Sequence, residues 1–130
     1  MKCGGNHDCH HHGCDCRGLL QGMLKPSLLL LIAREKAKHG YELGAELARL
    51  GLDLGVDSGR IYRILRQLEG EGLVKSEWST AAAGPARRNY LITHQGLDFL
   101  RLWQQTLEEA MARMGRVREG LEQLWSTDAQ

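Results

Sequence analysis

The sequence predicts a mostly α-helical fold with a small β-hairpin and a long C-terminal helix. Two patterns favour this class. Aliphatic residues run almost unbroken through one segment and recur three and four positions apart in three others, as on one face of a helix. Residues 73–78 and 87–93 instead alternate apolar and polar character, as strands do. With 130 residues, the chain has room for one compact domain and one protruding element.

The first two helices are predicted from their aliphatic residues and their ends. We expect one helix from Leu19 to about His39, with Pro26 in a tolerant position near its start and Gly40 ending it. A second, shorter helix ends at Gly51. Its single apolar stripe consists of Leu43, Leu47 and Leu50.

The third helix has an apolar face and a free one. Asp57 is a good N-cap, and the helix should run to about Glu69. At about 100° per residue, one side gathers the residues expected to pack: Ile61, Ile64, Leu65 and Leu68. The opposite side holds Gly59, Tyr62, Arg63 and Arg66. This side is free to touch a partner.

A hairpin and a long helix complete the chain. Glycines 70 and 72 end the third helix, the two strands follow, and Thr93 caps the last helix. The apolar seam of that helix holds Leu100, Trp103, Leu107, Ala110, Met114, Val117, Leu121 and Leu124. A seam this regular predicts pairing with a second helix. We therefore expect a homodimer, with Leu100, Trp103, Leu107, Met111, Met114 and Leu121 at the dimer interface or around an effector.

Three helices, a two-stranded wing and a trailing helix form the winged helix-turn-helix plan, in which a recognition helix enters the DNA major groove. The net charge is only +1, so DNA contact depends on local clustering of basic groups. The recognition helix carries Arg60, Arg63 and Arg66, and the base of the wing carries Arg87 and Arg88. Both groups of arginines are expected to reach phosphates.

Three ordered motifs carry a resemblance to a known family. They are "HGYEL" at 39–43, "VDSGRIYRILRQLEGEGLV" at 56–74, and "GPARRNYLIT" at 84–93 followed by "HQG". Together they resemble the PadR family of bacterial transcription regulators, over roughly residues 19–125. The short C-terminal part is similar to the smaller PadR subgroup, which has a single C-terminal dimerisation helix.

The resemblance implies a homodimeric winged-helix repressor that binds a palindromic operator in double-stranded DNA and is released by an effector. Two residues depart from the family pattern, because Ser58 and Arg63 stand where many members have proline. Some relatives of the small subgroup bind flat aromatic compounds between the subunits; Trp103 either lines such a space or fills the dimer core. The DNA-binding residues expected from motif and face are Tyr41, Ser58, Gly59, Arg60, Tyr62, Arg63, Arg66, Arg87 and Arg88.

Residues 1–17 form a separate Cys/His-rich tail that precedes a DNA-binding domain at 18–93 and a dimerisation helix at 94–126. The composition of the tail suits zinc or an iron–sulfur cluster, and hence metal or redox sensing. The spacing of its cysteines matches no standard metal motif, so a disordered tail is the alternative. The candidate ligands are Cys3, Cys9, Cys14, Cys16, His7 and His10.

Other classes of function find little support in the sequence. No apolar run approaches the roughly 18 residues of a membrane span, and the first residues do not resemble a secretory signal, so we expect a cytoplasmic protein with no membrane partner. The thiols lack a rigid scaffold with a base, so we expect no enzyme. The alternative function is a metal-handling or protein-interaction module that uses the winged helix without binding DNA.

Overall fold

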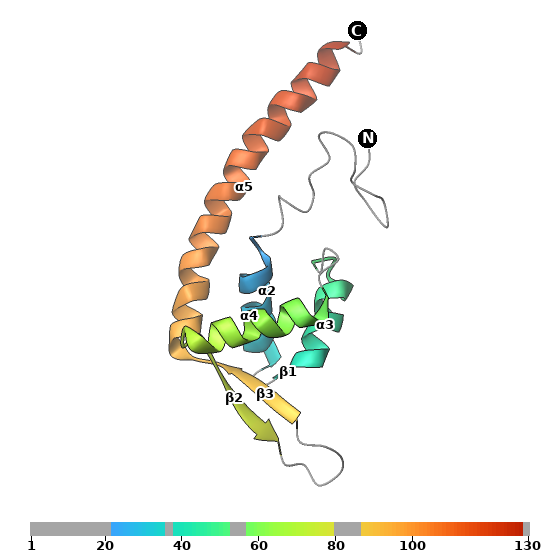
Figure 1. Ribbon diagram of the computed structural model, residues 1–130. Coiled ribbons are helices and arrows are strands. Elements are labelled where there is room, and N and C mark those ends of the chain that lie inside the picture. Colours follow the sequence, from blue (N-terminus) through green and yellow to red (C-terminus); the bar gives the residue numbers. More distant parts are fainter. Residues whose placement is uncertain (1–21, 36–37, 53–56, 80–86, 129–130) are drawn as a thin grey trace.

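The computed structural model describes residues 22–35, 38–52, 57–79 and 87–128 (Figure 1). The Cys/His-rich tail and the loop between the two strands of the wing lie outside these residues. The elements are α2 (Leu24–Glu35), β1 (Lys38–His39), α3 (Gly40–Arg49), α4 (Ser58–Gly70), β2 (Val74–Ser79), β3 (Arg87–Ile92) and α5 (His94–Asp128).

The core lies where α2, α3 and α4 meet the sheet. Helix α2 is nearly covered, and its Leu28, Leu29 and Ile32 are fully buried. The predicted apolar faces of the next two helices are confirmed. The buried residues on these faces are Leu43, Leu47, Ile61, Leu65 and Leu68, with Ile64 partly buried beside them.

The predicted hairpin is present and gains a third strand. β2 and β3 pair antiparallel, from Val74 opposite Ile92 to Ser79 opposite Arg87. β1 pairs with the other edge of β3, which gives the order β1-β3-β2. The prediction that the first helix continues to about His39 was therefore wrong. Lys38 and His39 instead form a two-residue strand that pairs with the edge of β3. A strand of two residues is too short to be recognised from the spacing of its side chains.

The predicted helix ends at Asp57, Gly51 and Gly72 are confirmed, whereas Gly40, which was expected to end the first helix, is the first residue of α3. The Asp57 carboxylate accepts a hydrogen bond of 2.8 Å from the Arg60 backbone N–H at the start of α4. Gly51 and Gly72, which follow α3 and α4, adopt positive φ angles of 72° and 77°, a conformation that favours glycine.

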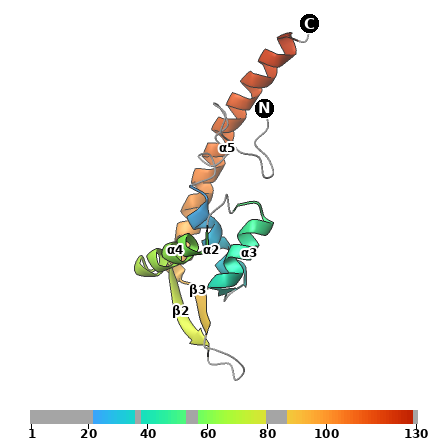
Figure 2. The same ribbon diagram turned by 45° about the vertical axis from the view of Figure 1, so that its right-hand side comes forward.

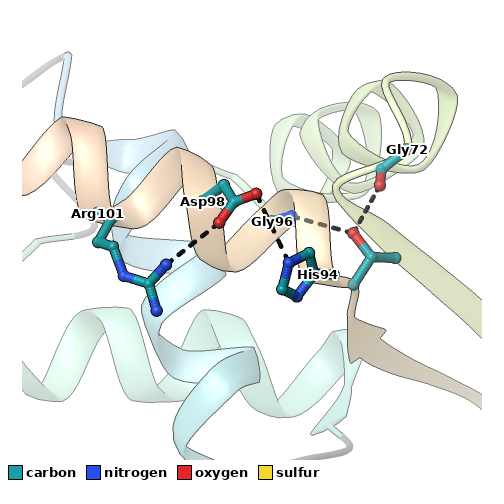
Figure 3. Close-up of polar contacts among 6 residues, drawn as sticks. Gly72, His94, Gly96, Asp98 and Arg101 are labelled. Atoms are coloured by element: carbon teal, nitrogen blue, oxygen red, sulfur yellow. Dashed lines mark hydrogen bonds and ion pairs between the residues drawn. The ribbon is translucent and has the colours of Figure 1, made fainter.

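Thr93 joins the end of α4 to the start of α5. Its hydroxyl donates to the Gly72 carbonyl at 2.6 Å and accepts from the Gly96 N–H at 3.0 Å, as Figure 3 shows for these two glycines. A Cβ on Gly96 would lie 2.2 Å from the Leu73 carbonyl oxygen, so only glycine fits there. The same view shows Asp98 between His94 and Arg101 on the exposed side of this first turn.

Helices α2, α3 and α4 and the sheet form the body of the protein. Helix α5 leaves this body soon after it begins. Phe99 and Leu100 pack against the core, and beyond them the helix projects away from the other elements in both views (Figures 1 and 2). Most of its later apolar side chains are exposed: Met111, Met114, Val117, Leu121, Leu124 and Trp125. Among the described residues, no helix combines the length and apolar character that a membrane crossing requires.

Candidate nucleic-acid interface

The free face of α4 carries the exposed arginines of the helix. Arg63 lies opposite the buried side at about 100° per residue, and Arg66 lies on one flank with Tyr62. Arg60 lies on the other flank. Within the described parts of the chain, no carboxylate pairs with any of these three arginines. Their charges are therefore available to an anionic partner.

Tyr62 joins the recognition helix to the start of α3. A Cβ built on Gly40 would lie 2.5 Å from Cε1 of Tyr62, so the ring crosses the bare backbone of that glycine. Tyr62 as a residue is nevertheless 41% exposed. Tyr62 therefore packs against Gly40 on one side and is exposed to solvent on the other.

Arg87 and Tyr41 form a second part of the same surface. Arg87 Nη1 donates a 2.6 Å hydrogen bond to the Tyr41 hydroxyl, and the guanidinium carbon lies 5.2 Å from the centre of the tyrosine ring. The His39 ring stacks on Tyr41, with 5.5 Å between ring centres and 6° between planes. Both Arg87 and Tyr41 are exposed. Because Arg87 meets a neutral hydroxyl, its charge is not cancelled.

Arg88 lies on the other face of the wing, since successive residues of a strand alternate. Its guanidinium lies 5.4 Å from the centre of the Trp78 ring, which belongs to its cross-strand neighbour. Arg88 Nη2 is 3.9 Å from Oε1 of Glu69 on α4. From the sequence we expected Arg87 and Arg88 to act together as one basic pair. In the structure they lie on opposite faces of the wing and contact different residues.

Tyr90 lies beneath this side of the wing. Burial is the main influence on its phenol and raises the pKa above its ordinary value of 10.0, because desolvation disfavours the charged form. The positive charge of Arg88 opposes the shift and the negative charge of Glu69 adds to it. Tyr90 therefore remains a neutral packing residue.

Sequence reasoning missed three residues that shape this interface. Gly40 was read only as the end of a helix, Glu69 only as the last residue of α4, and Trp78 only as part of a strand. A signal for Glu69 was present, because it lies three residues after Arg66 and seven after Tyr62 on one helix flank.

The remaining predicted residues divide between two regions. The candidate ligands Cys3, Cys9, Cys14, Cys16, His7 and His10 lie outside the described residues. Within the described ranges, no three His, Cys, Asp or Glu side chains gather as a metal site. Of the expected interface residues on α5, Trp103 and Leu107 are half-buried and Met111, Met114 and Leu121 are exposed. Leu100 packs against the chain's own core.

Comparison with known proteins identifies the family. A model of the "Transcriptional regulator PadR-like family" matches residues 28–102, more than half of the chain. The chain belongs to this PadR-like family. The matched residues contain most of α2, the recognition helix, the wing and the start of α5. This PadR-like protein is accordingly a transcriptional regulator with a DNA-binding winged helix.

Solved structures share the fold. A conserved protein of unknown function, described as a potential transcriptional factor, is 37% identical with a TM-score of 0.71, over 85% of this chain and 96% of that one. A PadR-like transcriptional regulator from Bacillus cereus is 28% identical with a TM-score of 0.68, over 77% and 95%. A PadR family regulator from Clostridium difficile is 28% identical with a TM-score of 0.60, over 71% and 95%. Among curated proteins, none matches the chain.

Proposed function

We propose that this PadR-like protein is a homodimeric repressor that binds a palindromic operator through α4 and the wing and is released by an effector. One observation supports it above all: a chain of contacts links the recognition helix to the wing. Tyr62 crosses Gly40, the adjacent Tyr41 holds Arg87, and Arg63 lies on the free face of the same helix. We call Tyr41, Tyr62, Arg63, Arg66 and Arg87 the basic surface.

The basic surface suits a DNA backbone in both charge and shape. Its three arginines have no carboxylate partner among the described residues. Guanidinium groups bind phosphate oxygens through paired donors, and tyrosine hydroxyls donate to the same oxygens. Helix α4 is exposed along this face, as entry into a major groove requires.

The uncovered stripe of α5 supports the dimer. Its apolar side chains recur three and four residues apart and find no cover in the chain that the structure describes. A second copy offers an identical stripe, and two-fold pairing buries both. The dimer then presents two recognition helices about 34 Å apart, one turn of DNA, which explains a palindromic operator.

The test compares binding to the DNA upstream of the protein's own gene with binding to a shuffled duplex of equal length. Changing both Arg63 and Arg66 to Ala should weaken binding roughly 10- to 100-fold and reduce the slope of log affinity against log salt by about 1.8, if each contacts one phosphate. Arg113→Ala on exposed α5 removes one arginine away from the basic surface and is the control. Equal binding by all variants would favour the scaffold function without DNA.

The composition of the tail supports a second proposal, that residues 1–17 bind zinc or an iron–sulfur cluster and that metal or redox state alters operator affinity. Four cysteines and four histidines fall between positions 3 and 16, and thiolate and imidazole groups are the ligands these metals prefer.

Metal analysis of the purified protein tests this proposal. We expect stoichiometric metal that is lost when Cys9, Cys14 and Cys16 are changed to Ser, and a change in DNA binding when chelator is added. An ultraviolet–visible spectrum distinguishes an iron–sulfur cluster from colourless zinc. A metal-free protein with DNA binding unchanged by chelator would contradict the proposal.

A further inference from the structure

Glu69 is an acidic residue on the recognition helix, beside the basic surface. It occupies the flank of α4 that also carries Tyr62 and Arg66. A carboxylate at such a place repels phosphate, so its presence on a DNA-facing helix requires a reason. Its contacts supply one.

Both carboxylate oxygens of Glu69 meet the wing. Oε2 accepts a 2.6 Å hydrogen bond from the Ser76 hydroxyl on β2, and Oε1 lies 3.9 Å from Arg88 Nη2 on β3. The Ser76 bond fixes the position of the carboxylate, so the negative charge stays beside Arg88. The Glu69 and Arg88 side chains are 33% and 41% exposed, respectively, so solvent reaches the pair.

Arg88 is held incompletely. A separation of 3.9 Å is too long for a direct hydrogen bond, and Arg88 Nε is buried without a partner in the part of the chain that the structure describes. Trp78 covers one face of the guanidinium, and the residue is itself 63% exposed. The Tyr90 phenol is a further hydrogen-bonding partner of Arg88, so the donor that remains unused among the described residues is the buried Nε.

We propose that Glu69 restrains Arg88 until DNA presents a phosphate at the correct place, and that this restraint limits the affinity of the protein for DNA. This inference rests on the proposed DNA-binding function. Non-specific binding grows with the number of free cations, because each one that meets a phosphate releases counterions. Glu69 removes Arg88 from that number in the free protein. A correctly docked operator places a phosphate close enough to compete with Glu69, whereas an unrelated duplex does not.

The experiment measures the affinity of Glu69→Gln for the upstream duplex and for the shuffled duplex across a salt series. Glutamine retains an oxygen that accepts from Ser76, so the variant keeps this anchor and loses only the charge. Affinity for the upstream duplex should rise about two- to fivefold, the range of an exposed ion pair, because its phosphate no longer has to displace the carboxylate. Affinity for the shuffled duplex should rise less, because its phosphates compete poorly with Glu69 for Arg88, so the ratio of upstream to shuffled affinity should rise.

Two further variants separate restraint of Arg88 from simple loss of negative charge. Glu77→Gln removes a carboxylate from the other face of β2, where Glu77 is exposed and has no ion pair among the described residues. It should leave the ratio unchanged. Arg88→Gln should abolish the effect of Glu69→Gln when the two changes are combined.

The outcomes are distinct. The restraint would be overturned if Glu69→Gln changed DNA affinity equally with and without Arg88. It would also be overturned if Glu69→Gln and Glu77→Gln changed DNA affinity equally. Either result would leave the DNA-binding proposal in place. Wild-type protein that binds neither duplex in a salt-dependent manner would overturn both.

Discussion

The body of the protein and the distal part of α5 share one apolar spacing and differ in what covers it. In the body, Leu43 and Leu47 lie four residues apart and are fully buried. On α5, Met114, Val117 and Leu121 follow the same rule and are 47%, 64% and 47% exposed. Helical periodicity therefore identifies a face that needs cover and leaves open which molecule supplies it.

The difference has a geometric cause. α5 contains 35 residues, about 52 Å at 1.5 Å per residue, and only its first turns contact the body. Figure 2 shows its distal part well away from α2, α3 and α4. The described elements of the body cannot flank so long a helix, so the distal stripe has no cover among the described residues, and the proposed dimer would supply it.

The largest expected effect is on stability, from cutting back the body's core. Leu65 is fully buried between α4 and its neighbours, and Leu65→Ala should lower the free energy of unfolding by about 2–5 kcal/mol, since it removes apolar contacts and leaves a cavity. Urea unfolding followed by circular dichroism, at fixed protein concentration, measures it.

The matched control is Leu102→Ala on α5. Leu102 is 67% exposed and lies off the apolar seam, so its truncation should change the unfolding free energy by less than about 0.5 kcal/mol. Similar losses for the two leucines would contradict the contrast between body and α5.

A smaller effect is expected on association. Leu121→Ala removes an exposed member of the distal stripe, and it should weaken the proposed dimer roughly tenfold while the body stays folded. Analytical ultracentrifugation over a range of concentrations measures the dissociation constant. Leu102→Ala is again the control, because it deletes the same atoms outside the seam. A protein that is monomeric at all concentrations would remove the basis for this expectation.

Much of the fold was predictable because local chemistry and global packing agree. Asp57 and Thr93 were expected to cap α4 and α5, and both do. The two strands of the wing followed from alternation, and the buried faces of α3 and α4 from spacing. These features depend on residues within a few positions of one another, which a sequence displays directly.

The details of the interface were less accessible. β1 contains only two residues and exists because the edge of β3 is free to receive it. The separation of Arg87 from Arg88 follows from strand alternation and was available in the sequence, but their partners Tyr41 and Glu69 were not. Those contacts depend on how α3 and α4 cross the sheet, which is decided by packing between distant segments.

The smallest expected effect is on the pH dependence of the unfolding free energy, through the buried phenol of Tyr90. Tyr90 is 2% exposed, and burial raises the pKa of its phenol, so the folded state binds this proton more tightly than the unfolded chain does. Its contribution to stability is present in full below the unfolded pKa of about 10 and is lost as the pH rises through the higher folded value. Tyr90→Phe cannot ionise and should escape this loss. The unfolding free energy of wild type should therefore fall relative to that of Tyr90→Phe as the pH is raised above about 10.

Because Arg88 favours the phenolate, adding Arg88→Gln to the wild-type background should enlarge the fall. Curves for wild type and Tyr90→Phe that stay parallel across this range would show that water reaches the phenol and that the body is less tightly covered than its buried leucines indicate.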